Sequence, residues 1–438
     1  MIQASAVQHG MWLAAARVAP AAYHMPLVVT FARDPDTGLL AKSCAAVAER
    51  HGLLSSAIVE RDGITYVVPA TFPAALRVAG PDESVEEEIA RPFNLAEGPL
   101  IRFALFGRTL VVTAHHLVFD GQSKEVLLRD LAALYSGAVP EPLPTTAADD
   151  LAADAARLAE RRAAAEEFWT GRWSEPQPLV VAGLELTGRD HGPGHAYRFT
   201  PPVPDLPGLT RFETLLAAVH ATLAAYGNPR VTTGVDLSTR ERGPAGIIGP
   251  YATEFPVDSE PGAAFTELRT KLREMYPHRA VPLARAVRRI RPHAALAPVS
   301  VSYRRLGETP HFDGAPAEVD WLAFAGGVRG DLQLQAVDDG TTVTASLRYS
   351  PAAAPVAERL ARDLCALLTR TAVLAIWRDV FGNPQIGPDD DLFDLGGDSL
   401  TATQIIARMR KTLGLDVDID TFFDHPTVNG VVHATDAD

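Results

Sequence analysis

The pattern that most constrains the fold of this 438-residue chain is a predicted β-hairpin that leads directly into a helix. Residues 101–106 and 110–112 have β-type patterns and are joined by a two-residue turn at Gly107-Arg108. Beyond them, Ser123 can cap an amphipathic helix. A strand end, a short loop and a helix together hold a side chain rigidly at the wall of a cavity. We therefore expect a functional site in the loop between the hairpin and the helix.

That loop contains His115, His116, Asp120 and Gly121. Adjacent residues at the end of a strand point to opposite faces, so only one of the two imidazoles can face a given cleft. Two neighbouring histidines also occur as ordinary core or surface residues, and their spacing does not distinguish these cases. We interpret the loop as a catalytic centre, with a purely structural pair of histidines as the alternative.

The histidines do not predict a metal site. Neighbouring side chains on a strand diverge, and no third ligand is spaced to join His115 and His116 around an ion. Another pair, His191 and His195, lies in a segment that glycine and proline make a loop. No helix can therefore align those two side chains for zinc.

The composition predicts a soluble globular protein of two to four domains. Hydrophobic residues make up 47% of the chain, and the net charge of −14 argues against a nucleic-acid or anionic-membrane surface. Cys44 and Cys365 are far apart and lie in amphipathic helical patterns, which favours free thiols in a reducing compartment. Without a recognisable signal sequence or membrane-spanning run, we expect a cytoplasmic protein.

Helix and strand patterns interleave through two successive regions, which predicts two α/β (α+β) lobes. We expect the first lobe at residues 1–172 and the second at residues 173–368. A proline-containing connector and an Ala/Glu/Arg-rich helix lie between the two regions. The helical pattern that follows Ala353 continues past Arg370 with hardly any linker.

The composition shifts at Thr371, where a small acidic module of residues 371–438 begins. It contains 12 Asp, no Glu and 4 Lys/Arg, so its net charge of −8 is more than half of the total. In this module a glycine-containing loop leads into a helix at Ser399. Serine at a helix N-terminus is often a simple cap, but the free N–H groups there also favour a phosphate.

Residues 1 to about 368 resemble the condensation domain of non-ribosomal peptide synthetases, in the chloramphenicol acetyltransferase-like superfamily. The family motif H-H-x-x-x-D-G is matched in full by His115, His116, Asp120 and Gly121. The resemblance extends to Gln8-His9-Gly10-Met11-Trp12, Arg50-His51, Pro92-Phe93-Asn94, Pro99-Leu100-Ile101-Arg102 and Phe168-Trp169.

The resemblance implies two chloramphenicol acetyltransferase-like lobes in a V-shaped pseudo-dimer with a tunnel between them. It implies that His116 faces the tunnel and that His115 packs inward. The implied reaction forms an amide, because the amine of an acceptor aminoacyl thioester attacks the carbonyl of a donor acyl thioester. His116 is then either a base or a group that positions reactants and stabilises charge. Gly121 lets a backbone N–H approach the oxyanion, and Asp120 is structural.

Residues 371–438 resemble a peptidyl carrier domain, a small four-helix bundle, through Leu-Gly-Gly-Asp-Ser-Leu at 395–400 and the segment 422–428. This implies 4′-phosphopantetheine attached covalently to Ser399. No adenylation domain lies between the two parts. The implied partners are therefore a separate adenylation enzyme that loads the carrier, an upstream donor carrier, a phosphopantetheinyl transferase and downstream synthetase enzymes. We expect the carrier to present the acceptor to its own tunnel, and the short linker leaves service to a downstream enzyme as the alternative.

Two departures from the family pattern bear on activity. Where the family has Leu-Arg-Thr, this chain has Leu54-Ser55-Ser56, so the arginine expected to pair with Asp120 is missing. In the second lobe, Thr253 replaces the Asn of a Gly-Phe-Phe-x-Asn-like stretch. Asp120 therefore needs another partner, and the tunnel is expected to differ near Thr253.

Two other functions remain as alternatives. An acyltransferase relative that uses an acyl-CoA donor or forms an ester is expected to have basic residues at the mouth of its pocket. An inactive recruiting platform would use only the carrier, against which the intact His115 and His116 argue. Epimerisation fits less well because such domains follow a carrier, and heterocyclisation needs an Asp-rich motif in place of the histidines.

Overall fold

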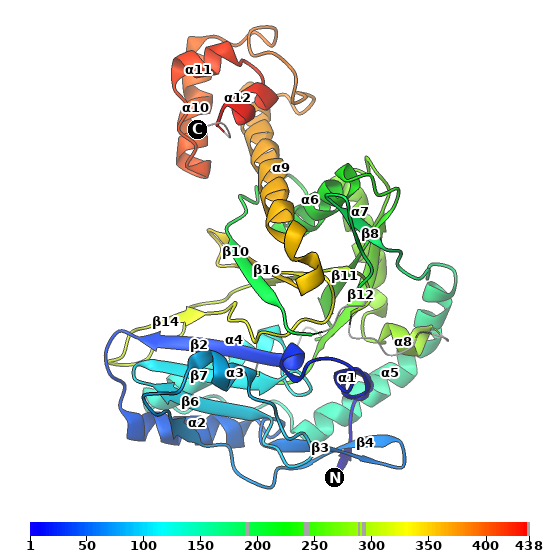
Figure 1. Cartoon of the computed structure of the whole chain (residues 1–438), viewed down its shortest axis with the longest axis vertical. Coiled ribbons are helices and arrows are strands. Elements are labelled where there is room, and N and C mark those ends of the chain that lie inside the picture. The colour runs from blue at the N-terminus through cyan, green and yellow to red at the C-terminus, as the bar shows by residue number, and fades with distance from the viewer. Residues whose placement is uncertain (189–191, 241–245, 288–289, 291–294, 436–438) are drawn as a thin grey trace.

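The computed structural model describes all residues except 189–191, 241–245, 288–289, 291–294 and 436–438. Two lobes of mixed sheet and helix lie one above the other, and a small helical bundle stands at the far end of a long helix (Figure 1). This arrangement confirms the predicted α/β (α+β) lobes followed by a four-helix bundle. No helix in the described ranges is long and apolar enough to cross a bilayer.

The first lobe is built on a sheet with the strand order β14-β2-β7-β6-β5. These strands are β2 (His24–Phe31), β5 (Leu76–Val78), β6 (Ile101–Phe106), β7 (Thr109–His115) and β14 (Ala317–Asp320). Apolar residues of two helices pack into the same core as the sheet, because they recur at helical spacing on one face. These helices are α2 (Thr37–Arg50) and α4 (Gly121–Tyr135). The lobe is completed by β1 (Ile2–Gln3), α1 (Ala6–Ala15), β3 (Ser56–Arg61), β4 (Ile64–Pro69) and α3 (Val85–Ala90).

The hairpin predicted before the histidines is present. Strands β6 and β7 pair antiparallel, and β7 ends at His115 as expected. The prediction that Ser123 caps the following helix is wrong, because α4 begins two residues earlier, at Gly121. Asp120 is the cap, and its carboxylate accepts a hydrogen bond of 2.7 Å from the backbone N–H of Ser123.

The described residues of the second lobe form a sheet with the strand order β10-β16-β15-β13-β11-β12. Its strands are β10 (His195–Phe199), β11 (Val231–Ser238), β12 (Ala252–Ser259), β13 (Val299–Arg305), β15 (Leu332–Asp338) and β16 (Val343–Tyr349). One face is covered by α6 (Arg211–Ala225), α7 (Phe265–Met275) and α9 (Ala354–Phe381). The other face carries polar side chains towards the first lobe, among them Asp236, Glu254 and Gln335. The sheet therefore offers a polar wall to the space between the lobes.

Two elements tie the lobes together. Strand β14 lies within the range 173–368 predicted for the second lobe, yet it pairs with β2 of the first, from Ala317 opposite Phe31 to Asp320 opposite Val28. Helix α5 (Ala147–Thr170) runs from the first lobe to the second, where it contacts α8 (Leu283–Ala286). A small hairpin of β8 (Leu179–Val181) and β9 (Leu184–Leu186) follows it.

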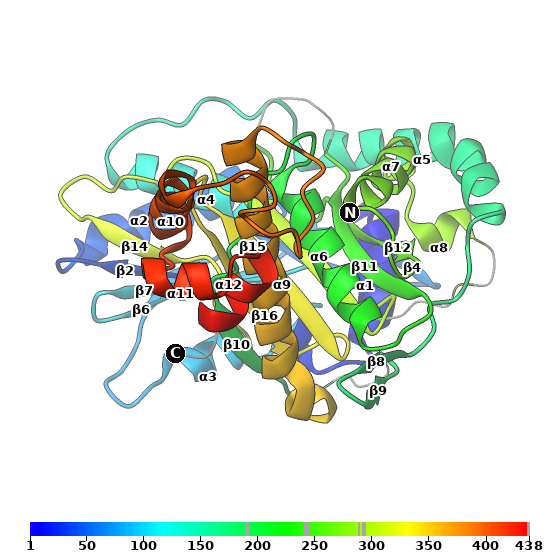
Figure 2. The same cartoon turned by 90° about the horizontal axis from the view of Figure 1, so that it is seen from above.

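Helix α9 belongs to two hydrophobic cores at once. Leu364 and Leu368 are buried in the core of the second lobe, whereas Val373 and Trp377 are buried in the core of the bundle. Only residues 369–372, about one helical turn, separate the two sets. Seen from above, α9 crosses the second lobe before it reaches the bundle (Figure 2), whose other helices are α10 (Ser399–Leu413), α11 (Ile419–Asp424) and α12 (Val428–Thr435). Lobe and bundle are therefore joined by continuous helix.

Candidate functional site

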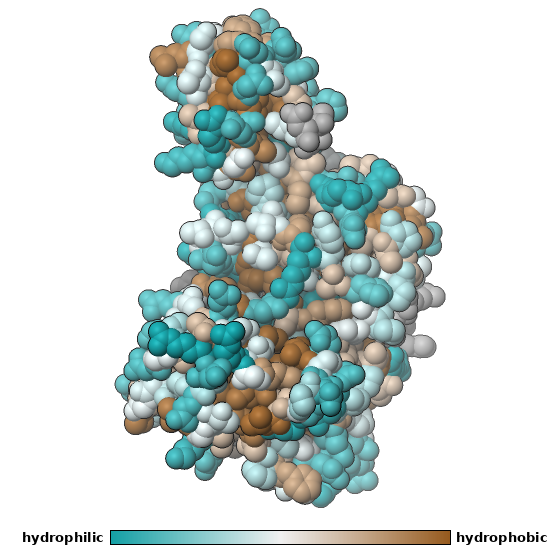
Figure 3. Space-filling view, turned by 60° about the vertical axis from the view of Figure 1, so that its left-hand side comes forward, coloured by the Kyte–Doolittle hydropathy of each residue, from teal (hydrophilic) through white to brown (hydrophobic). Residues whose placement is uncertain are grey.

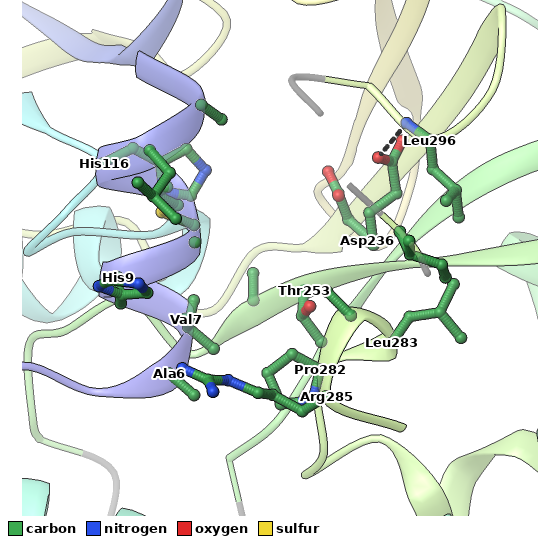
Figure 4. A pocket seen from close by; sticks show the side chains of 18 of the residues that line it. Ala6, Val7, His9, His116, Asp236, Thr253, Pro282, Leu283, Arg285 and Leu296 are labelled. Carbon is green, nitrogen blue, oxygen red and sulfur yellow. Dashed lines mark hydrogen bonds between the residues drawn. The ribbon is translucent and has the colours of Figure 1, made fainter. Parts of the chain in front are cut away.

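His116 lies where two cavities between the lobes meet. The first cavity has a volume of about 330 Å³ and the second of about 350 Å³, and both are lined by His116, Asp236, Ala252 and Arg329. The first cavity continues between α1 and α8, where His116 and Asp236 face one another across it (Figure 4). The second continues between α4 and strands β13 and β15. Reactants that enter the two cavities would meet beside one imidazole.

The loop that carries His116 is held from two sides. The backbone N–H of His116 donates to the carbonyl of Tyr23 at 2.9 Å. The side chain of Gln8, which is fully buried on α1, donates to the carbonyl of Leu117 at 2.9 Å. The backbone that carries the ring is thus fixed in position although it follows the end of a strand.

His115 points away from both cavities, as adjacent residues on a strand require. Its ring packs against three aromatic rings, with centroid distances of 6.1 Å to Tyr23, 5.8 Å to Phe93 and 6.2 Å to His24. Its Nδ1 accepts a hydrogen bond from the backbone N–H of Leu117 at 3.2 Å. Burial, more than the nearby positive groups, holds the pKa of His115 well below its usual value. The resemblance placed both rings correctly.

His116 is kept neutral by its surroundings. Burial lowers its pKa first and the guanidinium of Arg329 lowers it further, while Asp236 and Asp120 act in the opposite direction. The ring is 9% exposed, and its Nδ1 has no hydrogen-bond partner in the described part of the chain. Because Nδ1 is itself buried, a reactant in either cavity can reach only the other ring nitrogen, where a neutral imidazole can accept a proton.

Arg240 is the partner of Asp120 that the first-lobe sequence lacked. Its Nη2 lies 2.9 Å from Oδ1 of Asp120, and the backbone N–H of Tyr251 donates to Oδ2 at 3.2 Å. Asp120 belongs to the first lobe and the other two residues belong to the second. The carboxylate therefore fixes the start of α4 and also bridges the lobes next to His116, consistent with a structural role.

Gly121 lines the second cavity directly after Asp120. Its carbonyl accepts a hydrogen bond from Nη1 of Arg304, and a Cβ at this position would lie 3.0 Å from the same nitrogen. Glycine is thus suited to the close approach of Arg304.

Three residues that the sequence analysis did not single out also face His116. Asp236 on β11, Glu254 on β12 and Arg329 before β15 line the first cavity. The guanidinium of Arg329 also lies over the ring of Tyr23, at 5.6 Å from its centroid. Thr253, the departure from the family pattern, lines the same cavity. The signal for Asp236 and Glu254 was a carboxylate within each of two strands that also carry buried apolar residues.

Ser399 is exposed at the first position of α10. The cap of this helix is Asp398, whose carboxylate accepts from the backbone N–H of Thr401 at 2.9 Å. The loop before it passes tightly over Leu392, since a Cβ at Gly397 would lie 2.8 Å from that side chain. The hydroxyl of Ser399 is therefore not needed for capping, and the free N–H groups of the first turn suit a phosphodiester.

The cysteine, histidine and acidic side chains are those that could form disulfides or hold a metal ion. Cys44 and Cys365 are both free thiols, as predicted, with Cys44 buried and Cys365 half-buried. Among the described residues, no group of three or more His, Cys, Asp or Glu is arranged to hold a metal ion. His195 begins β10, whereas His191 lies outside the described residues.

Family models match both parts of the chain. The condensation domain model matches residues 1–184, and the phosphopantetheine attachment site model matches residues 371–435. The second match supports 4′-phosphopantetheine as the cofactor of the bundle.

Two curated synthases are similar to parts of this chain. Tyrocidine synthase 3 of Brevibacillus parabrevis is 24% identical over 296 residues, which is 58% of this chain and 4% of that protein. Surfactin synthase subunit 2 of Bacillus subtilis (strain 168) is 30% identical over 222 residues, which is 47% of this chain and 6% of that protein. The chain thus spans a small part of the length of these curated relatives.

Solved structures show that both lobes have the condensation-domain fold. The starter condensation domain of rhizomide synthetase, in complex with C8-CoA, superimposes with a TM-score of 0.72 at 19% identity, covering 84% of this chain and 94% of that one. The first condensation domain of the CDA synthetase gives a TM-score of 0.69 at 18% identity, covering 84% and 96%. The match to the condensation domain model places this part of the chain, in general terms, among acyl-transferring domains. Together, the family models and the similar proteins support a condensation domain of the non-ribosomal peptide synthetase type fused to a phosphopantetheine carrier domain.

Proposed function

We propose that this protein forms an amide bond between a donor acyl thioester and the amine of an acceptor aminoacyl thioester. The nitrogen attacks the thioester carbonyl, a C–N bond forms, the C–S bond breaks, and the sulfur leaves as a thiol. The observation that carries the proposal is the position of His116, buried and neutral where two cavities meet. Two carrier-bound thioesters can approach this ring from different sides.

In this proposal His116 accepts a proton from the attacking nitrogen and returns it to the leaving sulfur. A well-placed general base contributes about 10²- to 10⁴-fold to the rate. Holding both reactants in line contributes further, because it replaces a bimolecular encounter. His115 packs against Tyr23, whose ring also contacts the ring of His116. Asp120 joins the two lobes beside these rings. We keep Gly121 as the proposed site of a backbone N–H near the oxyanion.

We further propose that Ser399 carries the cofactor. Phosphopantetheine supplies the thiol on which an acyl or aminoacyl group is held as a thioester. The exposed hydroxyl at the start of α10 supports this assignment. The proposed partners are a phosphopantetheinyl transferase, a separate adenylation enzyme, an upstream donor carrier and downstream synthetase enzymes. Partner docking is supported by exposed apolar side chains on the carrier, whose surface stands clear of the lobes (Figure 3), namely Phe393, Leu400 and Ile419.

Helix α9 bears on which active site the carrier serves. Its residues are buried in the cores of the second lobe and of the carrier, with one turn between them. The carrier stands at the end of α9 away from the junction of the lobes (Figure 1). We propose that the carrier exchanges cargo with another chain while α9 is intact, and serves its own cavities only when α9 opens at residues 369–372. This proposal favours service to a downstream enzyme over presentation of the acceptor to the chain's own tunnel.

A second candidate function is acyl transfer from an acyl-CoA donor. Arg305 lines the second cavity and is exposed, so its charge is available to a phosphate. The other cationic side chains there are already engaged. Lys124 donates to the carbonyls of Pro26 and Trp321, Arg304 donates to the carbonyl of Gly121, and Arg329 lies over the ring of Tyr23. The structurally similar starter domain of rhizomide synthetase is in complex with C8-CoA. One exposed arginine supports a phosphate-bearing donor, free or carrier-bound, in the second cavity.

A single-turnover experiment tests the proposed reaction. An acceptor aminoacyl thioester on a separate carrier and a donor thioester are supplied, and the amide is followed by intact-mass spectrometry with wild-type protein and with His116→Ala. We expect a loss of about 10²- to 10⁴-fold in the variant. Unchanged product formation would instead support a recruiting platform in which only the carrier functions. The same measurement with an acyl-CoA as donor separates the two candidate functions.

A further inference from the structure

Two carboxylates lie directly opposite each other in the wall of the first cavity. Asp236 on β11 and Glu254 on β12 are partners in the antiparallel ladder, so both side chains leave the sheet on the same face. That face looks across the cavity towards His116 (Figure 4). Like charges in opposed positions destabilise a sheet, so the pair needs an explanation other than stability.

The position of Glu254 is built into the fold. Its Oε2 accepts a hydrogen bond of 2.8 Å from the backbone N–H of Leu296. Its other oxygen occupies the space above Gly234, where a Cβ would lie 2.1 Å from Oε1. Any side chain at residue 234 would displace the carboxylate. The absence of a side chain there therefore allows Glu254 to lie beside Asp236.

Within the described residues, the two carboxylates of the pair face fewer positive charges than would balance them. Among the described lining residues, Arg329 is the cation that acts on both carboxylates from within the cavity. Arg285 is exposed at the mouth, where water and salt screen its charge. The other titratable groups that face the cavity, within the described part of the chain, are His9, Tyr23 and His116. Burial is the first cause that lowers the pKa of both histidines and raises that of Tyr23, so all three are neutral.

Among the described residues, one carboxylate of the pair therefore has no compensating charge. Burial raises the pKa of Glu254 to about 7, and the negative charge of Asp236 adds to the effect while Arg329 opposes it. Two interacting carboxylates titrate as a pair, so the second negative charge is present only when a proton or a cation accompanies it. A ligand with one positive charge would balance the cavity.

We propose that Asp236 and Glu254 bind the ammonium group of the acceptor in the first cavity, and that Glu254 takes the first proton from it. An N–H bond of the ammonium breaks, the proton moves to a carboxylate oxygen of Glu254, and the electron pair stays on nitrogen. The result is a neutral amine beside a neutral carboxylic acid, while Asp236 still faces Arg329. The net charge of the cavity is the same before and after this step.

This inference rests on the proposed amide formation and supplies a proton acceptor that the reaction needs. The nitrogen loses one proton before it attacks and a second after the C–N bond has formed. His116 can carry the second from nitrogen to the leaving sulfur, but it cannot hold both. Glu254 takes the first. The first cavity is then the acceptor side, which leaves the second cavity to the donor.

A matched pair of probes tests the acidic pair without requiring turnover. The alanyl and lactyl thioesters of N-acetylcysteamine differ only in an amino or hydroxyl group, and their affinity for the full chain is measured by titration calorimetry. We expect Glu254→Gln and Asp236→Asn to weaken alanyl thioester binding about 10- to 100-fold, the range of a hydrogen bond to a charged group. Binding of the lactyl thioester should be unchanged. Equal effects on both probes, or no effect on the alanyl probe, would overturn the proposal.

Two further variants control for folding and for charge. Gly234→Ala displaces the Glu254 carboxylate without changing any charge, and it should reduce alanyl binding while lactyl binding is retained. Asp258→Asn removes a negative charge from β12, the strand that carries Glu254. Asp258 pairs with Arg230 and Lys271 and does not line either cavity, so this variant should bind both probes as the wild type does. Wild-type protein that binds the alanyl probe but makes no amide would refute the proposed reaction and leave the binding site standing.

Discussion

Arg240 and Asp120, 120 residues apart in sequence, form an ion pair of 2.9 Å that joins the two lobes beside His116. The carboxylate side chain is 3% exposed and also caps α4. The same carboxylate thus sets the start of the helix and the distance between the lobes. The spacing of the two cavities at His116 depends on a contact that neither lobe makes alone.

Removal of the arginine should loosen this junction. Arg240→Ala leaves the buried carboxylate of Asp120 without its cation, and breaking a buried pair in this way costs about 3 kcal/mol or more. We expect a lower melting temperature together with reduced amide formation. Arg230→Ala is the control, because its pair with Asp258 is about half exposed and contributes at most about 1 kcal/mol. Equal effects of the two variants would contradict a specific role for the Asp120 pair.

Substitution of His116 should mainly affect the reaction rate, and substitution of His115 should mainly affect stability. His116→Ala should abolish most amide formation with little change in melting temperature, because the ring lines a cavity. His115→Ala should lower stability by about 2 kcal/mol, because its ring packs against Tyr23 and Phe93. Measurement of both rate and thermal unfolding for each variant decides this. Matching losses of activity and stability in both variants would refute the division.

Asp130 should make stability depend on acid pH. Burial raises its pKa, but hydrogen bonds from His51 and Arg50 at the end of α2 outweigh burial and lower the pKa to about 2. A lowered carboxylate pKa adds stability above the unfolded value of about 4, and this contribution of about 2 kcal/mol is lost as the pH falls from about 4 to 2. Asp130→Asn should therefore be less stable than wild type at pH 6, and the difference should shrink below pH 4. A constant difference in urea unfolding across this range would exclude the effect.

Ser399 should be the residue that accepts phosphopantetheine. Incubation of the full chain with a phosphopantetheinyl transferase and coenzyme A should add one phosphopantetheine to the wild type and none to Ser399→Ala, as read by intact mass. Thr403→Ala, one turn further along α10, should be modified normally. Modification of Ser399→Ala would place the attachment site elsewhere.

A break in α9 should change which active site the carrier serves. A flexible Gly-Ser insertion after Arg370 separates the lobe and carrier cores without removing a residue of either. Wild-type protein with a loaded carrier should form amide with an added condensation partner, and the insertion should increase product within the same chain. Dilution distinguishes the two routes, because only the intramolecular rate is independent of concentration. Efficient concentration-independent product from the wild type would refute the proposal that α9 keeps the carrier away.

Much of the fold follows from local pattern. The hairpin before His115, the amphipathic helices and the acidic module are encoded by alternation, helical spacing and composition, and the structure confirms them. The cap of α4 was misplaced, because Asp120 and Ser123 are both good capping residues and the choice depends on where the helix begins. The pairing of β14 with β2 could not be foreseen, because a short strand has no pattern that identifies a partner nearly 300 residues away.

The sequence alone determined which residues we propose to carry the chemistry. Strand alternation allowed only one of His115 and His116 to face a cleft, the family resemblance selected His116, and the local pattern placed Ser399 at a helix start. Tertiary structure alone decided what surrounds them. Arg240 replaces the missing partner of Asp120 from the other lobe, and Asp236, Glu254 and Arg329 set the charge opposite His116. The reason is physical: strand and helix periodicity act between neighbours in sequence, whereas the charges and cavities of this site arise from residues that only packing of the two lobes brings together.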